Sequence, residues 1–248
     1  MINNILFKGI TRKGKLFYRR IRYRKGHGVH SPFVYNLITK VIEEQSPYYR
    51  FNDIELIRRQ MLFKEDKLAY FIKRGSISPK HGALLFRLAN YFRPDNILQV
   101  GQTFGLSTLY LTSYKPGVKC ISLENIPEYA SVSQWAYDKG ARTAIDRRIG
   151  NYHQLLPGIL QEMGKVDFVY FNLKNEQYPD IYLFNACIPH ISDQTVFVFE
   201  GIKASRNMRT LWKEICAHEK VTVSIDLLSM GLVFLNPKLH KRNYHVYF

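Results

Sequence analysis

The sequence has few cysteines, and none of them forms a recognisable functional pattern. Cys120, Cys187 and Cys216 are widely spaced and include no C-x-x-C pair. This spacing excludes the common zinc and dithiol redox motifs. Small apolar thiols of this kind are usually buried in a core. We therefore predict three buried free thiols in a protein of the reducing cytoplasm.

Long apolar runs and several catalytic signatures are also missing. The first residues lack the apolar centre of a signal peptide, and no run approaches the length needed to cross a membrane. G-x-S-x-G, P-loop and H-E-x-x-H motifs are absent. With 248 residues, 46% of them hydrophobic, the chain is long enough for one large α/β domain with an extension. We expect a soluble cytoplasmic protein.

Acidic residues are absent from the first 42 positions, where basic residues accumulate. The first acid is Glu43, and the chain as a whole carries a formal net charge of +16. Aromatic residues lie among the basic residues of the segment 8–25. Such a segment can bind nucleic acid by charge and stacking, or an anionic membrane surface. A solvated helix packed on the main domain is the third interpretation.

The first 95 residues have mainly helical patterns. Ser31-Pro32 suits a helix start, with serine as the N-cap and proline at the first helical position. Further helices are predicted from about Asp53 to Lys73 and from His81 to Phe92. Residues 1–95 are therefore predicted to form a basic helical N-terminal extension.

From Asn96 onward, strand patterns alternate with helical patterns, which indicates a mostly parallel sheet covered on both faces. Strands are predicted at 97–100, 119–124, 143–149, 166–172, 195–200, 221–228 and 231–235. Helices are predicted at 106–114, 127–139, 152–163, 180–191 and 205–218. Only Ser229-Met230 separates the last two strands, so they predict an antiparallel hairpin at the sheet edge. Residues 96–248 are thus predicted to form a Rossmann-like, seven-stranded α/β domain.

Two glycines follow the first predicted strand of this domain. Gly101 ends the apolar run Ile97–Val100, and Gly105 precedes the next helix. Glycine lets the backbone turn sharply and approach a ligand, and free N–H groups at a helix start favour polar or anionic groups. The spacing is G-x-x-x-G, with Gln102 and Thr103 inside it, and differs from the G-x-G-x-x-G of dinucleotide enzymes. The pattern predicts a nucleotide-like ligand.

The ends of the next two strands carry polar residues. Glu124 follows Gly101 by about 20 residues, the offset at which nucleotide-binding α/β sheets place an acid that accepts both ribose hydroxyls. A surface carboxylate at a strand end is the alternative. Gly150-Asn151 ends the third strand and either borders the adenine or forms an ordinary turn.

These residues resemble class I S-adenosylmethionine-dependent methyltransferases, specifically small bacterial members near the O-methyltransferase group. The motifs that carry the resemblance are Gly26–Phe33, Ile97–Leu111, Ser122–Glu128, Val166–Asn172, Phe197–Gly201 and Val221–Leu235. The resemblance implies a seven-stranded sheet with a reversed last strand and S-adenosylmethionine as cofactor. The cofactor-binding residues it implies are Gly101, Gln102, Thr103, Gly105, Glu124, Gly150, Asn151 and Asn172.

The chain departs from that family at its acidic positions. Asn172 and Gly201 stand where metal-dependent members have metal-binding aspartates, and Glu200 alone keeps a carboxylate. Lys174 and Lys203 add positive charge at the same place. Because divalent ions favour carboxylate oxygens, we expect no catalytic metal.

A further departure bears on activity. Gln99 stands where relatives have an acid that positions the cofactor's ammonium group. We therefore weigh a metal-independent methyltransferase that acts on O or N against a degenerate fold that only binds a partner. A third hypothesis is a nucleic-acid-binding module that uses the basic arm. For catalysis the sequence offers only weak candidates: His153, Lys174, Glu200 and Lys203.

Overall fold

The structure is a computed structural model that describes residues 28–63, 67–141 and 144–248. The basic segment 8–25 lies outside the described residues. Its proposed contacts with nucleic acid or another anionic partner therefore stay a prediction.

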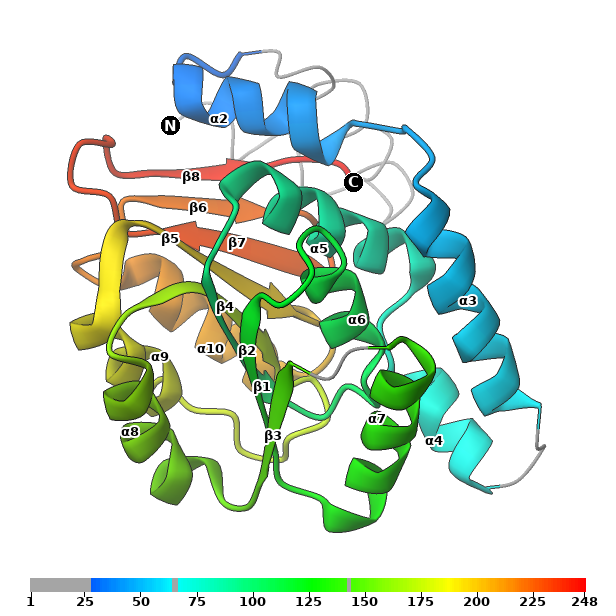
Figure 1. The fold of residues 1–248 in the computed structure, drawn as a ribbon. Helices are drawn as coiled ribbons and strands as arrows, with labels where there is room; N and C mark the ends of the chain where they lie inside the picture. Colours follow the sequence, from blue (N-terminus) through cyan, green and yellow to red (C-terminus); the bar gives the residue numbers. More distant parts are fainter. Residues whose placement is uncertain (1–27, 64–66, 142–143) are drawn as a thin grey trace.

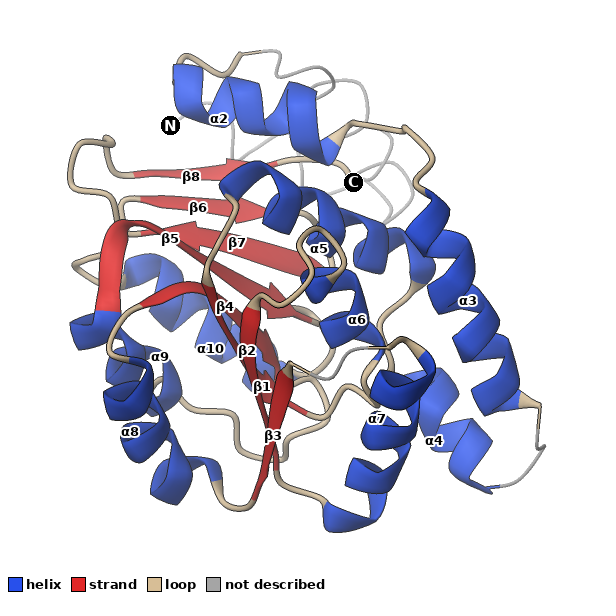
Figure 2. Cartoon of the chain, in the orientation of Figure 1, coloured by secondary structure: helices blue, strands red, loops and turns tan. Residues whose placement is uncertain are grey.

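The described chain forms one eight-stranded sheet with helices on both faces (Figures 1 and 2). The strand order is β3-β2-β1-β4-β5-β7-β6-β8. The strands are β1 Asn96–Gly101, β2 Lys119–Glu124, β3 Ile145–Ile149, β4 Val166–Asn172, β5 Ile191–Glu200, β6 Val223–Asp226, β7 Met230–Phe234 and β8 Arg242–His245. β7 is antiparallel to both β5 and β6, and the other pairs are parallel. This confirms the predicted α/β class and the reversed strand near the C-terminus.

The helices divide into two layers. Those before and around the first strands are α2 Pro32–Leu37, the π-helix Ile38–Ile42, α3 Tyr49–Leu62, α4 Lys67–Gly75, α5 Pro79–Phe92, α6 Leu106–Thr112 and α7 Pro127–Lys139. The other layer consists of α8 Tyr152–Met163, α9 Tyr182–Cys187 and α10 Arg206–Ala217, with a short 3₁₀ turn Ile188–His190. Successive residues of a strand point to opposite faces of the sheet and so pack against different layers. Val198 of β5 packs in the core under α5, and its neighbour Phe197 packs in the core under α8–α10. Figure 1 shows the α8–α10 layer on the side of the sheet opposite α5 and α6.

The described N-terminal helices are part of the main hydrophobic core. Val34 and Leu37 of α2 and Leu84 of α5 belong to the same buried cluster as Ile97 and Val198 of the sheet. Ser31 caps α2 as predicted, because its hydroxyl accepts a hydrogen bond from Val34 N at 3.4 Å. A division of the chain at residue 95 stays a prediction about domain organisation.

The sheet corrects the predicted strand count and the predicted edge. An eighth strand, β8, pairs in parallel with β6, so the β6–β7 hairpin does not form the edge of the sheet. Only Tyr244 of β8 is buried, and its neighbours are exposed. An edge strand needs few apolar residues, which explains why the polar sequence Arg242–His245 gave no strand signal.

Two predicted helices were wrong in extent. The single helix predicted from Asp53 to Lys73 is two helices, α3 and α4; the buried hydrophobic residues are Ile54, Ile57 and Met61 in α3 and Ala69 and Ile72 in α4. The helix predicted to reach Ile191 ends at Cys187, because Pro189 cannot supply the next backbone donor. β5 therefore begins at Ile191.

The described residues include no helix that is both long and apolar enough to cross a bilayer. Cys120 and Cys187 are buried, as predicted, and burial raises the pKa of the Cys120 thiol to about 12. Cys216 is only partly buried, which corrects the prediction for that thiol.

Candidate functional site

The turn after β1 is built around a close approach of two strands. Gly101 has a φ of +110°, and a Cβ at this position would lie 2.2 Å from the backbone oxygen of Asn172, at the end of β4. Any other residue at this position would be strained at this φ, and its Cβ would clash with the Asn172 backbone. Gly101 therefore fixes the ends of β1 and β4 against each other.

The second half of the turn holds two residues in the left-handed region. Phe104 has a φ of +53° and Gly105 a φ of +80°. The left-handed conformation is unfavourable for an aromatic residue by about 1 kcal/mol or more. The Phe104 ring is buried against Gly75 of α4 and lies 5.1 Å from the Tyr129 ring, measured between centroids. This packing holds the turn in place.

Gln99 stabilises the same turn through the hydrogen bonds of its side chain. Its Nε2 donates to Gly101 O at 3.0 Å, and its Oε1 accepts the hydroxyls of Thr103 and Thr108. The Tyr137 hydroxyl extends this buried network to Thr108. A carboxylate at position 99 could not donate to Gly101 O. Because both ends of the Gln99 amide are bonded within the protein, its acceptor oxygen is already occupied.

Glu124 lies at the end of β2, adjacent to β1, and its side chain is fully buried. The Ser133 hydroxyl of α7 donates to its carboxylate at 2.8 Å. Burial raises the pKa of Glu124 from 4.5 to about 7, although the Ser133 hydrogen bond opposes the rise. Of the two interpretations of this acid, a surface carboxylate is therefore wrong.

Amide side chains at the ends of β1, β2 and β4 have buried atoms without hydrogen-bond partners; Gln102 and Asn172 are buried and Asn125 is partly buried. Both polar atoms of the Gln102 amide, Oδ1 of Asn125 and Oδ1 of Asn172 have no hydrogen-bond partner among the described residues. Asn172 Nδ2 donates to Gln102 O at 2.6 Å and thereby fixes its orientation. Buried polar atoms without partners are rare in proteins because each costs about 1–3 kcal/mol. Because these atoms lie at the carboxyl ends of neighbouring strands, they indicate a polar ligand.

The end of β3 has a simpler local role. Asn151 is exposed and caps α8, because its Oδ1 accepts from His153 N and Gln154 N at 2.9 and 3.3 Å. Gly150 N donates to Glu124 O at 2.8 Å, which ties the ends of β2 and β3 together. A contact of either residue with adenine stays a prediction.

The residues at the ends of β4 and β5 do not suit a divalent cation. Lys174 is largely buried, its Nζ donates to Ser76 O at 3.2 Å, and burial lowers the pKa of its ammonium group. Its Cβ packs against Gly201, where a hypothetical Cβ would lie only 2.5 Å away. A cationic side chain thus occupies the place next to Glu200 where acidic ligands would be needed. Within the described ranges, no group of three His, Cys, Asp or Glu residues could bind a metal ion.

Two of the weak catalytic candidates lie outside this cluster. His153 is exposed, bonds to Asp180 Oδ2 at 2.8 Å and stacks on Tyr182. Lys203 bonds to both carboxylate oxygens of Asp226 at 2.7 Å. Neither side chain meets Glu200 or Lys174 in any hydrogen bond of the described residues.

The structure adds residues that the sequence did not indicate. His81 of α5 bonds to Glu200, and Ser229, in the turn before β7, bonds to His81. Asn125 Nδ2 donates to Glu176 beside the end of β2. No spacing rule joins positions 148 residues apart. The predicted helix began at His81, and nothing in the sequence marked that residue as functional.

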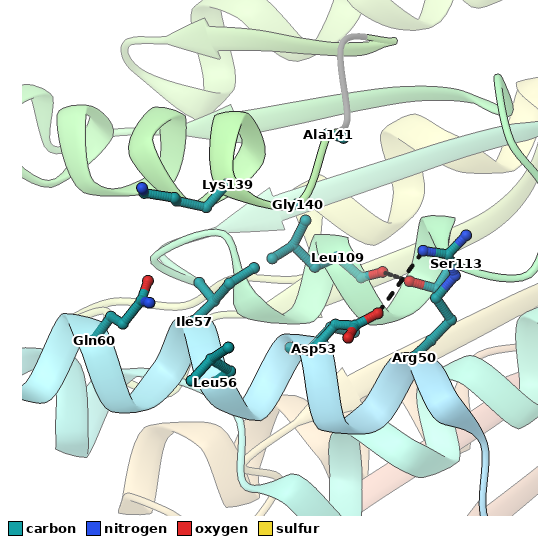
Figure 3. Close-up of a pocket in the computed structure, with 11 residues that line it drawn as sticks. Arg50, Asp53, Leu56, Ile57, Gln60, Leu109, Ser113, Lys139, Gly140 and Ala141 are labelled. Atoms are coloured by element: carbon teal, nitrogen blue, oxygen red, sulfur yellow. Dashed lines mark hydrogen bonds and ion pairs between the residues drawn. The ribbon is translucent and has the colours of Figure 1, made fainter.

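Two pockets of the described residues are lined by side chains other than those of Gln102, Glu124 and Asn172. Figure 3 shows one of about 330 Å³ between α3 and the ends of α6 and α7. The Arg50–Asp53 ion pair and Leu109 line it. Another pocket, of about 400 Å³, lies between α10 and the strands β6 and β8.

No protein-family model matches the chain. Over 110 residues, or 43% of its length, the chain is 29% identical to a catechol O-methyltransferase of Niastella koreensis. That segment spans only 50% of the relative.

Solved structures match far more of the chain. The O-methyltransferase from Bacillus cereus in complex with SAH matches 82% of this chain and 97% of its own, with a TM-score of 0.59 and 16% identity. The SAH-bound methyltransferase of Podospora anserina matches 83% and 96%, with a TM-score of 0.62 and 11% identity. The fold is that of the class I methyltransferases. The resemblance implies a seven-stranded sheet with a reversed last strand. Strands β1–β7 form such a sheet, in which β7 is the antiparallel strand, and β8 is added beside β6. These similarities do not favour the hypothesis of a degenerate binding protein.

Proposed function

We propose that this chain is an S-adenosylmethionine-dependent methyltransferase that acts on an oxygen or nitrogen atom of its acceptor without a metal ion. The observation that carries the proposal is the group of unpartnered buried amides beside Gly101. The TomG O-methyltransferase from Streptomyces achromogenes, whose structure is in complex with SAM, shares the fold at a TM-score of 0.59 and 17% identity. The fold similarity and the polar cluster support the same cofactor.

The residues present fit such a cofactor. Gly101 keeps the turn free of side chains, Gln102 and Asn172 offer donors and acceptors, and Glu124 offers carboxylate oxygens for paired hydroxyls. We propose that these residues hold the cofactor together with Thr103 and Gly105. Bound there, S-adenosylmethionine would supply a methyl group on a positively charged sulfur. The protein contributes chiefly proximity and orientation.

Metal independence is proposed from the donor set. Asn172 could offer a metal only a neutral amide oxygen, Oδ1, because its Nδ2 donates to two backbone oxygens, those of Gln102 and Gly75. Gly201 has no side chain, and the Lys174 stem covers it. A divalent ion would have to compete with His81 for the one remaining carboxylate, that of Glu200, and would be repelled by the nearby Lys174 ammonium. Activity should therefore persist after exhaustive chelation.

Calorimetry with S-adenosylmethionine and Gln102→Leu tests the proposal. The Gln102 amide makes no hydrogen bond of ordinary length among the described residues, although it lies near enough to Glu124 to lower the pKa of that carboxyl, so replacing it should change thermal stability little. Loss of hydrogen bonds to the cofactor, worth about 1.4 kcal/mol, should weaken binding roughly tenfold. Gln154→Leu, at an exposed position of α8, is the matched control and should bind like the wild type. Absence of binding by the wild type at millimolar cofactor would refute the proposal.

A further inference from the structure

Three side chains from distant parts of the sequence form one continuous hydrogen-bonded chain at the carboxyl end of β5. His81 Nδ1 lies 3.0 Å from Glu200 Oε1. His81 Nε2 lies 2.9 Å from Ser229 Oγ. The three come from α5, the last residue of β5 and the turn before β7. An acid, an imidazole and a hydroxyl are thus aligned in series.

Hydrogen bonds of backbone groups fix the positions of His81 and of the turn that carries Ser229. His81 N donates to the hydroxyl of Ser78, the N-cap of α5. Ser229 O accepts from Gly201 N at 2.7 Å and from Ile202 N at 3.2 Å. The turn that carries Ser229 is therefore held against the loop that follows Glu200. The positions do not depend on flexible side chains alone.

The partners of His81 determine which ring nitrogen carries the proton. An ionised carboxylate only accepts hydrogen bonds, so the Glu200 contact requires a proton on Nδ1. Nε2 is then an acceptor, and the Ser229 hydroxyl can donate to it. In this tautomer the nitrogen that can take up a further proton is Nε2, which faces Ser229.

The three side chains differ in their solvent exposure and in their charged neighbours. The side chain of Glu200 is 6% exposed and that of His81 14%, whereas Ser229 is only partly buried. Ser229 and His81 are thus both partly accessible, whereas Glu200 lies beneath them. The charged and titratable neighbours are Lys174 and Tyr170 beside Glu200, and Lys80, whose ammonium lies 4.4 Å from the centroid of the Phe248 ring that stacks on His81.

We propose that Ser229, His81 and Glu200 form a proton relay that deprotonates the hydroxyl of an alcohol or phenol, and that such a compound is the methyl acceptor. This inference rests on the proposed methyltransferase function. The acceptor O–H proton passes to Ser229 Oγ as the Ser229 proton passes to His81 Nε2. The methyl group replaces that proton on the acceptor oxygen. The positive charge that the cofactor sulfur loses then resides on the imidazolium, beside the Glu200 carboxylate.

The chemistry of the acceptor favours this class. A phenolic hydroxyl ionises near pH 10, so it is almost entirely protonated at neutral pH and needs a base before attack. A carboxylate is already ionised and needs none. Ser229 touches the acceptor, His81 takes the proton, and Glu200 positions and stabilises His81.

Nitrogen-15 NMR of histidine-labelled protein tests the hydrogen-bonded chain without any catalysis. His81→Gln identifies the resonance by its loss. We expect the wild type to show His81 protonated on Nδ1 and not on Nε2, and we expect Glu200→Ala, which removes the acceptor, to abolish this preference. Protonation of the neutral ring on Nε2 in the wild type would overturn the relay.

Methyl transfer from S-adenosylmethionine to catechol, 4-nitrocatechol and benzoate tests the acceptor class. The nitro group acidifies the neighbouring hydroxyls, so 4-nitrocatechol depends less on a base. His81→Gln should lower the rate on catechol at least 100-fold and on 4-nitrocatechol less than 10-fold, with cofactor affinity unchanged. Ser229→Ala, which leaves the His81–Glu200 bond intact, should also be slower on catechol.

His153→Gln is the matched control, because that histidine is exposed and pairs with Asp180 instead. It should leave the rate unchanged. Equal losses on both phenols in His81→Gln would overturn the relay, as would methylation of benzoate alone. Cofactor binding without methylation of any phenol would overturn it too. Failure to bind the cofactor would instead refute the proposed function, and the NMR experiment would still report on the hydrogen-bonded chain.

Discussion

Glu124→Gln should stabilise the protein while weakening its affinity for S-adenosylmethionine. Glu124 is fully buried at the end of β2, and burial raises its pKa from 4.5 to about 7. A carboxyl whose pKa is higher in the folded state stabilises the protein most when protonated. Its contribution is therefore complete below pH 4.5 and is lost as the pH rises through 7. The change from 4.5 to about 7 corresponds to roughly 3 kcal/mol of unfolding free energy.

The glutamine variant keeps an acceptor for the Ser133 hydroxyl and cannot ionise. Urea denaturation at pH 5 and pH 8 measures the effect. The difference in unfolding free energy between Glu124→Gln and the wild type should grow by about 3 kcal/mol over that interval. Glu128→Gln, on the exposed surface of α7, is the control and should parallel the wild type.

Cofactor binding should respond in the opposite direction. If ribose hydroxyls donate to the ionised Glu124 carboxylate, wild-type affinity should rise about tenfold between pH 6 and pH 8. The glutamine variant should bind more weakly and show no such dependence. A stability difference that does not change with pH would refute the buried acid. A stabilised variant with wild-type affinity would refute the ribose contact.

The remaining predictions concern stability. Gly82→Ala in α5 should destabilise the protein by about 1–3 kcal/mol in thermal unfolding, because the new Cβ would lie 2.3 Å from the Tyr110 ring. Gly158→Ala in α8 meets no atom within 4 Å and should stabilise it by about 0.5–1 kcal/mol; equal effects at the two sites would contradict this packing. Asp226→Asn should lower the melting temperature at pH 7. Burial opposes ionisation of Asp226, yet hydrogen bonds from His245 and Lys203 hold its pKa below 3.8. The stability it provides is lost as the pH falls, so the two proteins should converge below pH 4 in circular dichroism, and a constant difference would disprove the ion pairs.

The sequence predicted the class of fold because parallel sheets leave a strong local signal. The buried strands β1, β2 and β4 are short apolar runs that end at Gly101, Glu124 and Asn172, respectively. Gly101 was recognisable because only glycine tolerates its φ and the contact with β4. Local patterns failed where the residue type carried little information, as in the exposed strand β8.

The amino-acid sequence by itself determined the order of strands and helices, the glycine turn and the acid at the end of β2. Only the tertiary structure decided the state of these residues. Sequence spacing could not show that both ends of the Gln99 amide are bonded within the turn. Nor could it show that Lys174 covers Gly201, or that His81 joins Glu200 to Ser229. These relations depend on long-range contacts between strand ends and helix starts, which the periodicity of a single segment does not encode.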